Sequence, residues 1–529
     1  MRDLSYIKTG IPAFDRLIPE VRGFLEKDLQ IMNIDGEEIR GYRSPDTPSV
    51  WIRDYSDMLR GIRFFEKDIK SVVKHFADTQ AANGRIFDYF CTNPEKLPCE
   101  RENWTKYVRV PAEADVEYRF IKAAFLAWQA CGDDEWIQGL LPSMESAINY
   151  SFNHPHRIDK GTGLIKRPYT IDTWDFAYTA GRHDWLQFQI DAHTYWGIFH
   201  GDNSGYYEAA RILENLFGYF DKPDKAGHYS VLAEKTRDAL IENCWNGNFF
   251  THFVKLSDCS IPGVDEGSQL SMSNPMAINR GVTTIEQSRS IIAEYIERSK
   301  KNESAFAEWF SIDPPFPDGI FGDELLKAGS YINGGIFPLA GGELALAAFE
   351  SGFEEFGVDI LKRYYELLEE KGGSWLWYFP DGSPSTSETS TSPEATSTDG
   401  WGSTAMLNAL VSGLAGMADR SKLFNELRLA PRWPAAGIDR AEVRINYEAS
   451  GEYLQYKYLQ KPSSIELEIM GRDCETDFHL LLPKGKKTGS VSADGKEINF
   501  SVEQVAESRY VNFHRYINKH TFIEIKLLS

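Results

Sequence analysis

The sequence predicts a mainly α-helical fold followed by a C-terminal all-β domain. Helical periodicity recurs from Phe14 to Met417, whereas short runs of alternating apolar and polar residues begin near Arg428. A length of 529 residues exceeds the usual single domain, and 42% apolar residues are ample for a sizeable core. We therefore expect a large helical domain over residues 1–425 and a smaller one over residues 426–529.

The periodicity predicts about twelve helices. They are expected at residues 14–29, 51–76 with a break near Lys67, 113–131, 134–152, 185–199, 204–220, 228–244, 284–299, 335–349, 354–370 and 402–417. Short turns such as residues 132–133 join neighbours into hairpins. Six hairpins are the number needed to close an (α/α)6 toroid, in which an inner ring of helices alternates with an outer ring.

The C-terminal part predicts strands, because its apolar residues alternate with polar ones between Gly, Pro, Asp and Lys. The expected strands cover residues 442–447, 454–458, 464–470, 478–482, 489–491, 498–502, 505–510 and 521–527. We expect a β-sandwich-like accessory domain that covers one side of the toroid.

Composition and simple motifs exclude several classes of protein. A formal charge of −21 opposes nucleic acids and acidic membranes, and six cysteines without CxxC spacing indicate neither a disulfide framework nor a zinc site. No GxSxG, Walker or strand-linked GxGxxG motif is present. Without a secretory or membrane-spanning apolar segment, a cytoplasmic protein is expected. Homo-oligomerisation is left open.

Two loops far apart in the chain carry acids beside tryptophan. The first contains Asp172, Trp174 and Asp175, and the second contains Glu388 and Glu394 ahead of Trp401. Glycosidic bonds are cleaved by a proton-donating carboxylic acid and a second carboxylate, and tryptophans stack on sugar rings. The loops therefore predict a glycosidase if the fold brings them face to face. Asp172 is the alternative to Asp175, and Glu394 is the alternative to Glu388.

Three short motifs resemble the six-hairpin glycosidases, the superfamily of glucoamylases, trehalases and processing α-glucosidases. Residues 51–54 (WIRD) resemble the glucoamylase WxRD segment, and residues 172–176 are similar to the trehalase GWDF and glucoamylase LWEE stretches. Residues 387–389 with 400–403 resemble the glucoamylase loop that precedes the twelfth helix. The resemblance covers residues 10–420 in architecture, although this second loop is shorter and richer in Ser and Thr, and no one family fits throughout.

The resemblance implies an inverting, exo-acting hydrolase of α-linked, gluco-configured oligosaccharides that needs no metal or cofactor. Asp175 would be the general acid, with its pKa raised by Trp174 and Phe176, and Glu388 would be the base. Inversion requires the two carboxyl groups to lie about 6.5–9.5 Å apart. Trp51, Arg53 and Asp54 would hold the terminal sugar, unless Arg53 and Asp54 instead pair with neighbouring elements.

Further residues are expected to line the pocket. They are Glu113 or Glu117 at a helix start, Gln189, Asp191, His193 and Trp196 on an inner helix, Asn333 in an NGG segment, and the aromatic residues Trp375, Trp377 and Trp401. Trp375 and Trp377 could equally plug the end of the barrel.

Three rival functions use the same fold. A sugar epimerase or isomerase would need two histidines near the barrel axis, for which His193 and either His183 or His200 are the candidates. A non-catalytic carbohydrate-binding protein would keep the pocket without the acid and base. A phosphorolytic relative is less consistent with the sequence, since no phosphate cradle accompanies the expected base.

Overall fold

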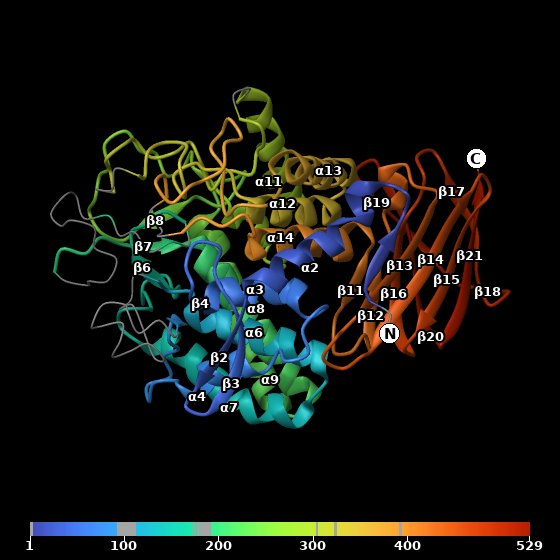
Figure 1. Cartoon of the computed structure of the whole chain (residues 1–529), viewed down its shortest axis with the longest axis horizontal. Coiled ribbons are helices and arrows are strands. Elements are labelled where there is room, and N and C mark those ends of the chain that lie inside the picture. Colours follow the sequence, from blue (N-terminus) through green and yellow to red (C-terminus); the bar gives the residue numbers. More distant parts are fainter. Residues whose placement is uncertain are drawn as a thin grey trace.

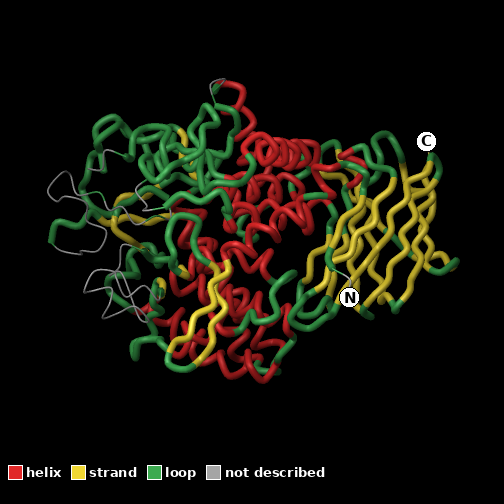
Figure 2. Tube along the Cα trace, viewed as in Figure 1, coloured by secondary structure: helices red, strands yellow, loops and turns green. Residues whose placement is uncertain are grey.

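The computed structural model describes residues 4–91, 113–172, 174, 178, 192–302, 305–321, 325–390 and 394–528. Helices form one body and strands form the other, with the C-terminus at the far edge of the strand-rich body (Figure 1, Figure 2). None of the described helices is long and apolar enough to cross a bilayer.

Six helices contact one another in a closed ring. They are α3 (Ile52–Ile62), α6 (Val116–Cys131), α8 (His200–Tyr219), α10 (Ser273–Asn279), α12 (Pro338–Glu350) and α14 (Gly400–Asn408). Each contacts the next in this order, and α14 also contacts α3. Every residue of α3 and α14 is buried, as expected of helices enclosed on all sides.

A second set of helices packs outside the ring. It comprises α2 (Leu17–Asp28), α4 (Ser71–Asp78), α7 (Asp134–Asn153), α9 (Pro223–Cys244), α11 (Ile285–Lys301) and α13 (Glu354–Lys371), each in contact with one or two ring helices. These helices bury one face only. In α11, for example, Ile291, Ile292 and Tyr295 are buried, and a capping box of Thr284 and Gln287 starts the helix.

Most predicted helices are confirmed. The helix expected at residues 185–199 is wrong in the part of this range that the structure describes, residues 192–199. Trp196–Phe199 form strand β7, which pairs with β6 (Lys166–Pro168) and β8 (Phe253–Lys255). The ring helix begins only at His200. The sequence analysis also missed α10, because seven residues are too few to show helical periodicity.

Short strands lead directly into ring helices. β4 (Val50–Trp51), paired with β5 (Tyr89–Phe90), precedes α3, and β7 precedes α8. β9 (Leu270–Ser271), paired with β10 (Ile312–Asp313), precedes α10. A further hairpin, β2 (Leu29–Ile34) with β3 (Glu37–Tyr42), follows α2. These pairings fix where the ring helices start.

The strand-rich body contains two larger sheets. One has the order β1-β13-β14-β15-β21-β17-β18, and the other has the order β11-β12-β16-β20-β19. Their bounds are β1 Tyr6–Lys8, β11 Met417–Asp419, β12 Glu426–Leu429, β13 Arg440–Asn446, β14 Tyr453–Lys461, β15 Ser464–Gly471, β16 Cys474–Leu481, β17 Lys487–Ala493, β18 Lys496–Ile498, β19 Ser501–Val505, β20 Ser508–Ile517 and β21 His520–Leu528.

Two features of these sheets differ from expectation. The strand predicted at residues 505–510 spans a turn, with Ala506 in the left-handed region (φ 53°), so that β19 ends and β20 begins within it. Strand β1 comes from the chain start yet pairs with β13 at the sheet edge. The domain boundary between residues 425 and 426 stays a prediction.

Candidate functional site

Polar side chains gather where the ring helices begin, a region that we call the ring opening. Asp115 is the N-cap of α6, Asp202 lies in the first turn of α8, and Ser273 begins α10. Asp399 caps α14 by accepting a hydrogen bond from the Gly402 amide at 2.9 Å. Every one of these side chains is buried. So many buried polar groups at one end of a helical ring point to a functional site.

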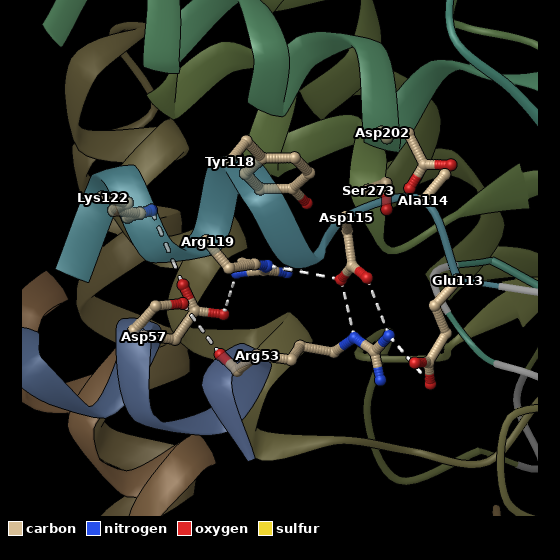
Figure 3. A network of polar contacts seen from close by, with 12 residues as sticks. Arg53, Asp57, Glu113, Ala114, Asp115, Tyr118, Arg119, Lys122, Asp202 and Ser273 are labelled. Carbon is tan, nitrogen blue, oxygen red and sulfur yellow. Dashed lines mark hydrogen bonds and ion pairs between the residues drawn. The ribbon is translucent and has the colours of Figure 1, made fainter. Parts of the chain in front are cut away.

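An ionic network links α3 to α6 at the ring opening (Figure 3). Arg53 donates from Nε and Nη2 to the two carboxylate oxygens of Asp115 at 2.7 and 2.8 Å. Arg53 also lies 3.2 Å from Glu113. Deeper in the ring, Arg119 donates to Asp57 at 2.5 Å. The predicted sugar-binding residue Arg53 is therefore held in a bidentate ion pair, which leaves its guanidinium rigidly placed.

The charged residues of α3 and α6 follow helical spacing. Arg53, Asp57 and Arg60 stand at i, i+4 and i+7 of α3. Asp115, Arg119 and Lys122 have the same spacing on and just before α6. Residues so spaced share one helix face, and the two faces meet in a column of ion pairs. Apart from Arg53, the residues of this column are not among the predicted site residues, although charges that repeat along one face of an otherwise apolar helix are a readable signal.

The network contains carboxyl groups that ionise very differently. Burial opposes ionisation of Asp57, but Arg119, Arg60 and Lys122 outweigh it and hold the pKa of Asp57 well below its usual range. Burial raises the pKa of Asp202 to about 6 despite Arg167, which donates to Asp202 at 3.3 Å. Burial and Asp46 raise the pKa of Asp54 to about 7, while Ser44 donates to it at 2.6 Å.

The ring opening thus combines a carboxyl group that stays ionised with carboxyl groups whose raised pKa values lie close to neutral pH. That mixture is what general acid and base catalysis requires of a site.

An aromatic cluster joins the two acid-bearing loops. The Trp174 ring lies 5.7 Å from Trp401 and 5.4 Å from Tyr331, between centroids. Trp174 Nε1 donates to the Tyr331 hydroxyl at 2.8 Å, and Trp401 Nε1 donates to Asp57 at 3.1 Å. Two tryptophans singled out from the sequence are therefore neighbours, and Trp401 is bonded directly to the ionic column.

Asp172 anchors the start of the first loop, whereas Asp175 lies outside the described residues. Asp172 is buried with a left-handed backbone (φ 48°). Its carboxylate accepts from Ser273 Oγ at 2.9 Å, and its amide donates to His252 Nε2 at 3.0 Å. These bonds fix Asp172 against α10, a structural task. Gln189 and Asp191 also lie outside the described residues.

The two candidate bases of the second loop, Glu388 and Glu394, differ in their exposure and in their contacts. Glu388 is exposed, in a turn closed by the Ser390 amide donating to the Thr386 carbonyl at 3.0 Å. Glu394 is half-buried and accepts a hydrogen bond from Arg43. The Glu394 amide donates to the Asp46 carbonyl at 3.2 Å.

Asp46 connects Glu394 to the aromatic cluster, since the Tyr331 hydroxyl donates to the Asp46 carboxylate at 3.4 Å. The contacts of the described residues therefore tie Glu394, rather than Glu388, to the ring opening.

Other predicted sugar-binding residues make structural contacts. Trp51 stacks on Tyr89 at 4.2 Å and donates to Thr47 at 2.6 Å. Glu117 is buried and accepts from the Ile86 amide at 3.4 Å. Asn333 exchanges hydrogen bonds with the Phe316 backbone and donates to the Leu326 carbonyl at 2.9 Å, so it shapes a loop.

The remaining predicted residues lie apart from the network. His193 is exposed and, contrary to expectation, neither it nor Trp196 belongs to a helix. Trp377 is fully buried, 5.9 Å from Tyr331, while Trp375 is partly exposed. The burial of Trp377 fits the plug interpretation better than a sugar platform.

Two buried histidines lie near the ring opening, His200 and His252, whereas the candidate His183 lies outside the described residues. His200 Nδ1 lies 3.1 Å from the Thr251 carbonyl, and His252 Nε2 accepts from Asp172. Burial lowers the pKa of His200 to about 3, and burial together with His200 lowers the pKa of His252. Both rings are therefore neutral near pH 7 and already engaged with the backbone.

Comparison with known proteins identifies the fold. No protein-family model and no curated protein matches the sequence. Among solved structures, the α-L-rhamnosidase of Dictyoglumus thermophilum matches with a TM-score of 0.61 and 12% identity, over 99% of this chain and 50% of that one. The Streptomyces avermitilis α-L-rhamnosidase, complexed with L-rhamnose, matches with a TM-score of 0.60 and 11% identity, over 98% of this chain and 42% of that one.

A shorter solved structure is matched over its whole length. The GH63 mannosylglycerate hydrolase of Thermus thermophilus has a TM-score of 0.52 and 12% identity, over 75% of this chain and 100% of that one. This chain spans about half the length of the rhamnosidases that it matches. At such low identity the likeness establishes a shared fold, a helical body with a strand-rich body, and nothing finer.

Proposed function

We propose that this protein is a glycoside hydrolase whose ring helices form an (α/α)6 toroid. The observation that carries the proposal is the ring opening, where the ionised Asp57 accepts a hydrogen bond from Trp401, which packs against Trp174. Burial raises the pKa of Asp54 to about 7 and that of Asp202 to about 6 in the same region. The fold shared with α-L-rhamnosidases over nearly the whole chain supports the same interpretation. Carboxyl pairs beside aromatic residues are the usual means of cleaving glycosidic bonds.

In this proposal Asp175 protonates the departing oxygen and Glu394 deprotonates the attacking water. Glu394 is preferred to Glu388 because Arg43 orients its carboxylate and Asp46 ties its backbone to the aromatic cluster. Attack of water on the face opposite the leaving group inverts the anomeric centre. We propose exo action on an α-linked sugar, with Arg53 as a contact for its hydroxyls.

The substrate panel follows from the resemblance and the fold comparison. Aryl α-D-glucosides represent the gluco-configured expectation, and aryl α-L-rhamnosides and mannosylglycerate represent the substrates named for the matched structures. Proton NMR of the first product anomer separates inversion from retention. Release of no sugar from any of these or from a disaccharide panel would contradict hydrolysis.

Three substitutions test the assigned roles. Asp175→Asn should slow hydrolysis of substrates with poor leaving groups by about 10²–10⁴-fold, because no proton reaches the departing oxygen. Glu394→Gln should slow all substrates, and Glu388→Gln should keep near-normal rates. Circular dichroism controls for folding. If Glu388→Gln abolishes activity and Glu394→Gln does not, Glu388 rather than Glu394 is the base.

The rival functions give distinct outcomes in the same assays. An epimerase would convert a free sugar, but burial lowers the pKa of both histidines near the ring opening and keeps them neutral at pH 7, which suits proton shuttling poorly. A non-catalytic carbohydrate-binding protein would bind sugar in calorimetry but release no sugar from any substrate. A phosphorylase would require added phosphate.

A further inference from the structure

A cavity lies at the opposite end of the ring from the ring opening, and we call it the axial cavity. Its volume is about 210 Å³. The lining comes from the later turns of the ring helices. It includes Arg60 of α3, Arg63 just after α3, Lys122 of α6 and Arg280 just after α10. Strand β11 contributes Asp419. No residue assigned to sugar cleavage above lines it.

Four cationic side chains line the axial cavity, and three of them have carboxylate partners. Arg60 pairs with Glu343, while Lys122 and Arg280 lie 3.3 and 3.5 Å from Glu208. Arg63 lies within 4 Å of no carboxylate in the described part of the chain. Its polar contact is with the Gln129 side chain at 3.2 Å, and it faces the Tyr447 ring at 5.5 Å.

Asp419 is the third carboxyl group of the lining, and other donors already occupy it. It accepts from the Phe424 amide at 2.9 Å, the Ser421 amide at 3.1 Å and the Tyr447 hydroxyl at 3.1 Å. Asp57, just outside the lining, also lies 3.8 Å from Arg60 and 3.5 Å from Lys122. The cation of the lining that has no close carboxylate among the described residues is therefore Arg63.

Hydrogen-bond donors of this lining are left over. Among the described residues, Arg60 Nη2 and Arg63 Nε are buried without a hydrogen-bond partner. Two acceptors of the lining, Glu208 Oε2 and Asn279 Oδ1, are buried without one as well, although Glu208 Oε2 lies against Lys122 and Arg280. Both arginine side chains are almost fully buried, since Arg60 and Arg63 are each 7% exposed. A buried donor without a partner is costly, and a buried guanidinium without a counter-charge is more so. Water would satisfy the donors but would not supply the missing negative charge.

We propose that the axial cavity binds a small oxyanion such as phosphate. Its oxygens would accept from Arg60 and Arg63, whose planar forks suit oxyanions, and its charge would balance Arg63. A tetrahedral oxyanion fits within about 210 Å³ together with ordered water. Asp57 contacts both Arg119 toward the ring opening and Lys122 toward the cavity, so the site adjoins the ionic column.

The first experiment is a phosphate titration of the full-length wild-type protein, with sodium chloride holding ionic strength constant. Anion binding to the folded state raises its melting temperature in a saturable way. We expect calorimetry to give one phosphate per chain. Melting curves and heats that phosphate leaves unchanged relative to chloride would overturn the proposal.

Matched variants locate the site. Arg63→Met should weaken phosphate binding at least about tenfold, because it removes the uncompensated charge. Arg420→Met is the control, since Arg420 is an exposed partner of Asp477 and should leave binding unchanged. Equal phosphate affinity in Arg63→Met and wild type would place any binding elsewhere and refute the assignment.

A second variant keeps the test valid if Arg63→Met fails to fold. Ser412 lines the axial cavity from the segment that follows α14, and it is partly buried. Ser412→Asp places a carboxylate among the cations, so it should remove the phosphate-dependent rise in melting temperature while the phosphate-free protein stays folded. An undiminished phosphate response in this variant would also refute the proposal. Neither outcome depends on whether the protein cleaves sugars.

Discussion

At the scale of single residues, Asp57 shows how the ring is held in register. Its carboxylate accepts from Arg119 and Trp401 and lies 3.8 Å from Arg60 and 3.5 Å from Lys122. One side chain on α3 thereby joins α6 and α14. Buried ion pairs of this kind add little net stability over apolar packing, but losing one partner is costly. The column therefore specifies geometry more than it adds stability.

Asp28 provides a pH-dependent prediction. Thr398 donates to its carboxyl group at 2.7 Å, and burial raises the pKa of Asp28 to about 7. Because the folded pKa lies above the unfolded value of about 3.9, this group's contribution to stability is complete below pH ~4 and is lost as the pH rises through about 7. Asp28→Asn should therefore flatten the decline in unfolding free energy between pH 5 and pH 8.

Urea unfolding at the two pH values measures this effect. Asp238→Asn, at an exposed position of α9, is the control and should keep the wild-type pH dependence. An Asp28→Asn protein with the same pH dependence as the wild type would show that Asp28 ionises normally.

At the scale of helices, glycines set how closely the ring closes. A Cβ at Gly342 of α12 would lie 2.4 Å from the Ala405 backbone carbon of α14, and one at Gly205 of α8 would lie 2.3 Å from the Tyr118 ring of α6. Neither contact is possible without movement. Small residues at these positions allow neighbouring ring helices to touch.

Gly342→Ala should accordingly destabilise the protein by about 1–3 kcal/mol, because the obstructing atoms are backbone. Gly227→Ala is the matched control on α9, where an added Cβ meets nothing within 4 Å. That control should stabilise by about 0.5–1 kcal/mol through helix propensity and reduced freedom of the unfolded chain. Denaturant midpoints compare the two, and equal effects would mean that α12 and α14 are not in close contact.

At the scale of the whole molecule, the end of α12 joins the helical body to the strand-rich body. Glu350 accepts from Arg432 at 2.9 Å and also bonds Arg428 of β12. Glu354 of α13 accepts from Ser508 of β20 at 2.7 Å and from Tyr510. This charged and largely buried group of contacts couples the two bodies at the ends of α12 and α13.

Glu350→Gln should weaken these contacts in a pH-dependent way. Burial opposes ionisation, but Arg432 and Arg428 outweigh it and lower the pKa of Glu350 to about 2. Since the folded pKa is below the unfolded one, this stabilisation is present above pH ~4.3 and is lost as the pH falls toward about 2. At pH 7 the variant should lose about 3 kcal/mol, because fully buried Arg432 keeps its charge without its partner.

Calorimetry at pH 7 and pH 3 tests this expectation, and the loss should shrink at pH 3. Glu355→Gln, at an exposed position of α13, should change neither value. A Glu350→Gln protein whose melting temperature falls equally at both pH values would argue against an ionic role.

The two kinds of structure and the candidate chemistry follow from the amino-acid sequence alone. Periods of 3.6 and 2 residues distinguish most of the helices from the strands, because each reflects which face of one element is buried. Trp174 and Trp401 were recognised from their acidic neighbours, and their rings lie 5.7 Å apart. The sequence pattern predicts a feature correctly where neighbouring residues alone determine that feature.

Only the tertiary structure decided which distant residues meet. Arg60 pairs with Glu343, 283 positions away, and Glu394 is connected to Tyr331 through Asp46. The strand at Trp196–Phe199 forms because β6 and β8 flank it, and α10 is too short to be specified alone. Partner choice depends on packing between segments remote in the chain, and no single segment encodes it.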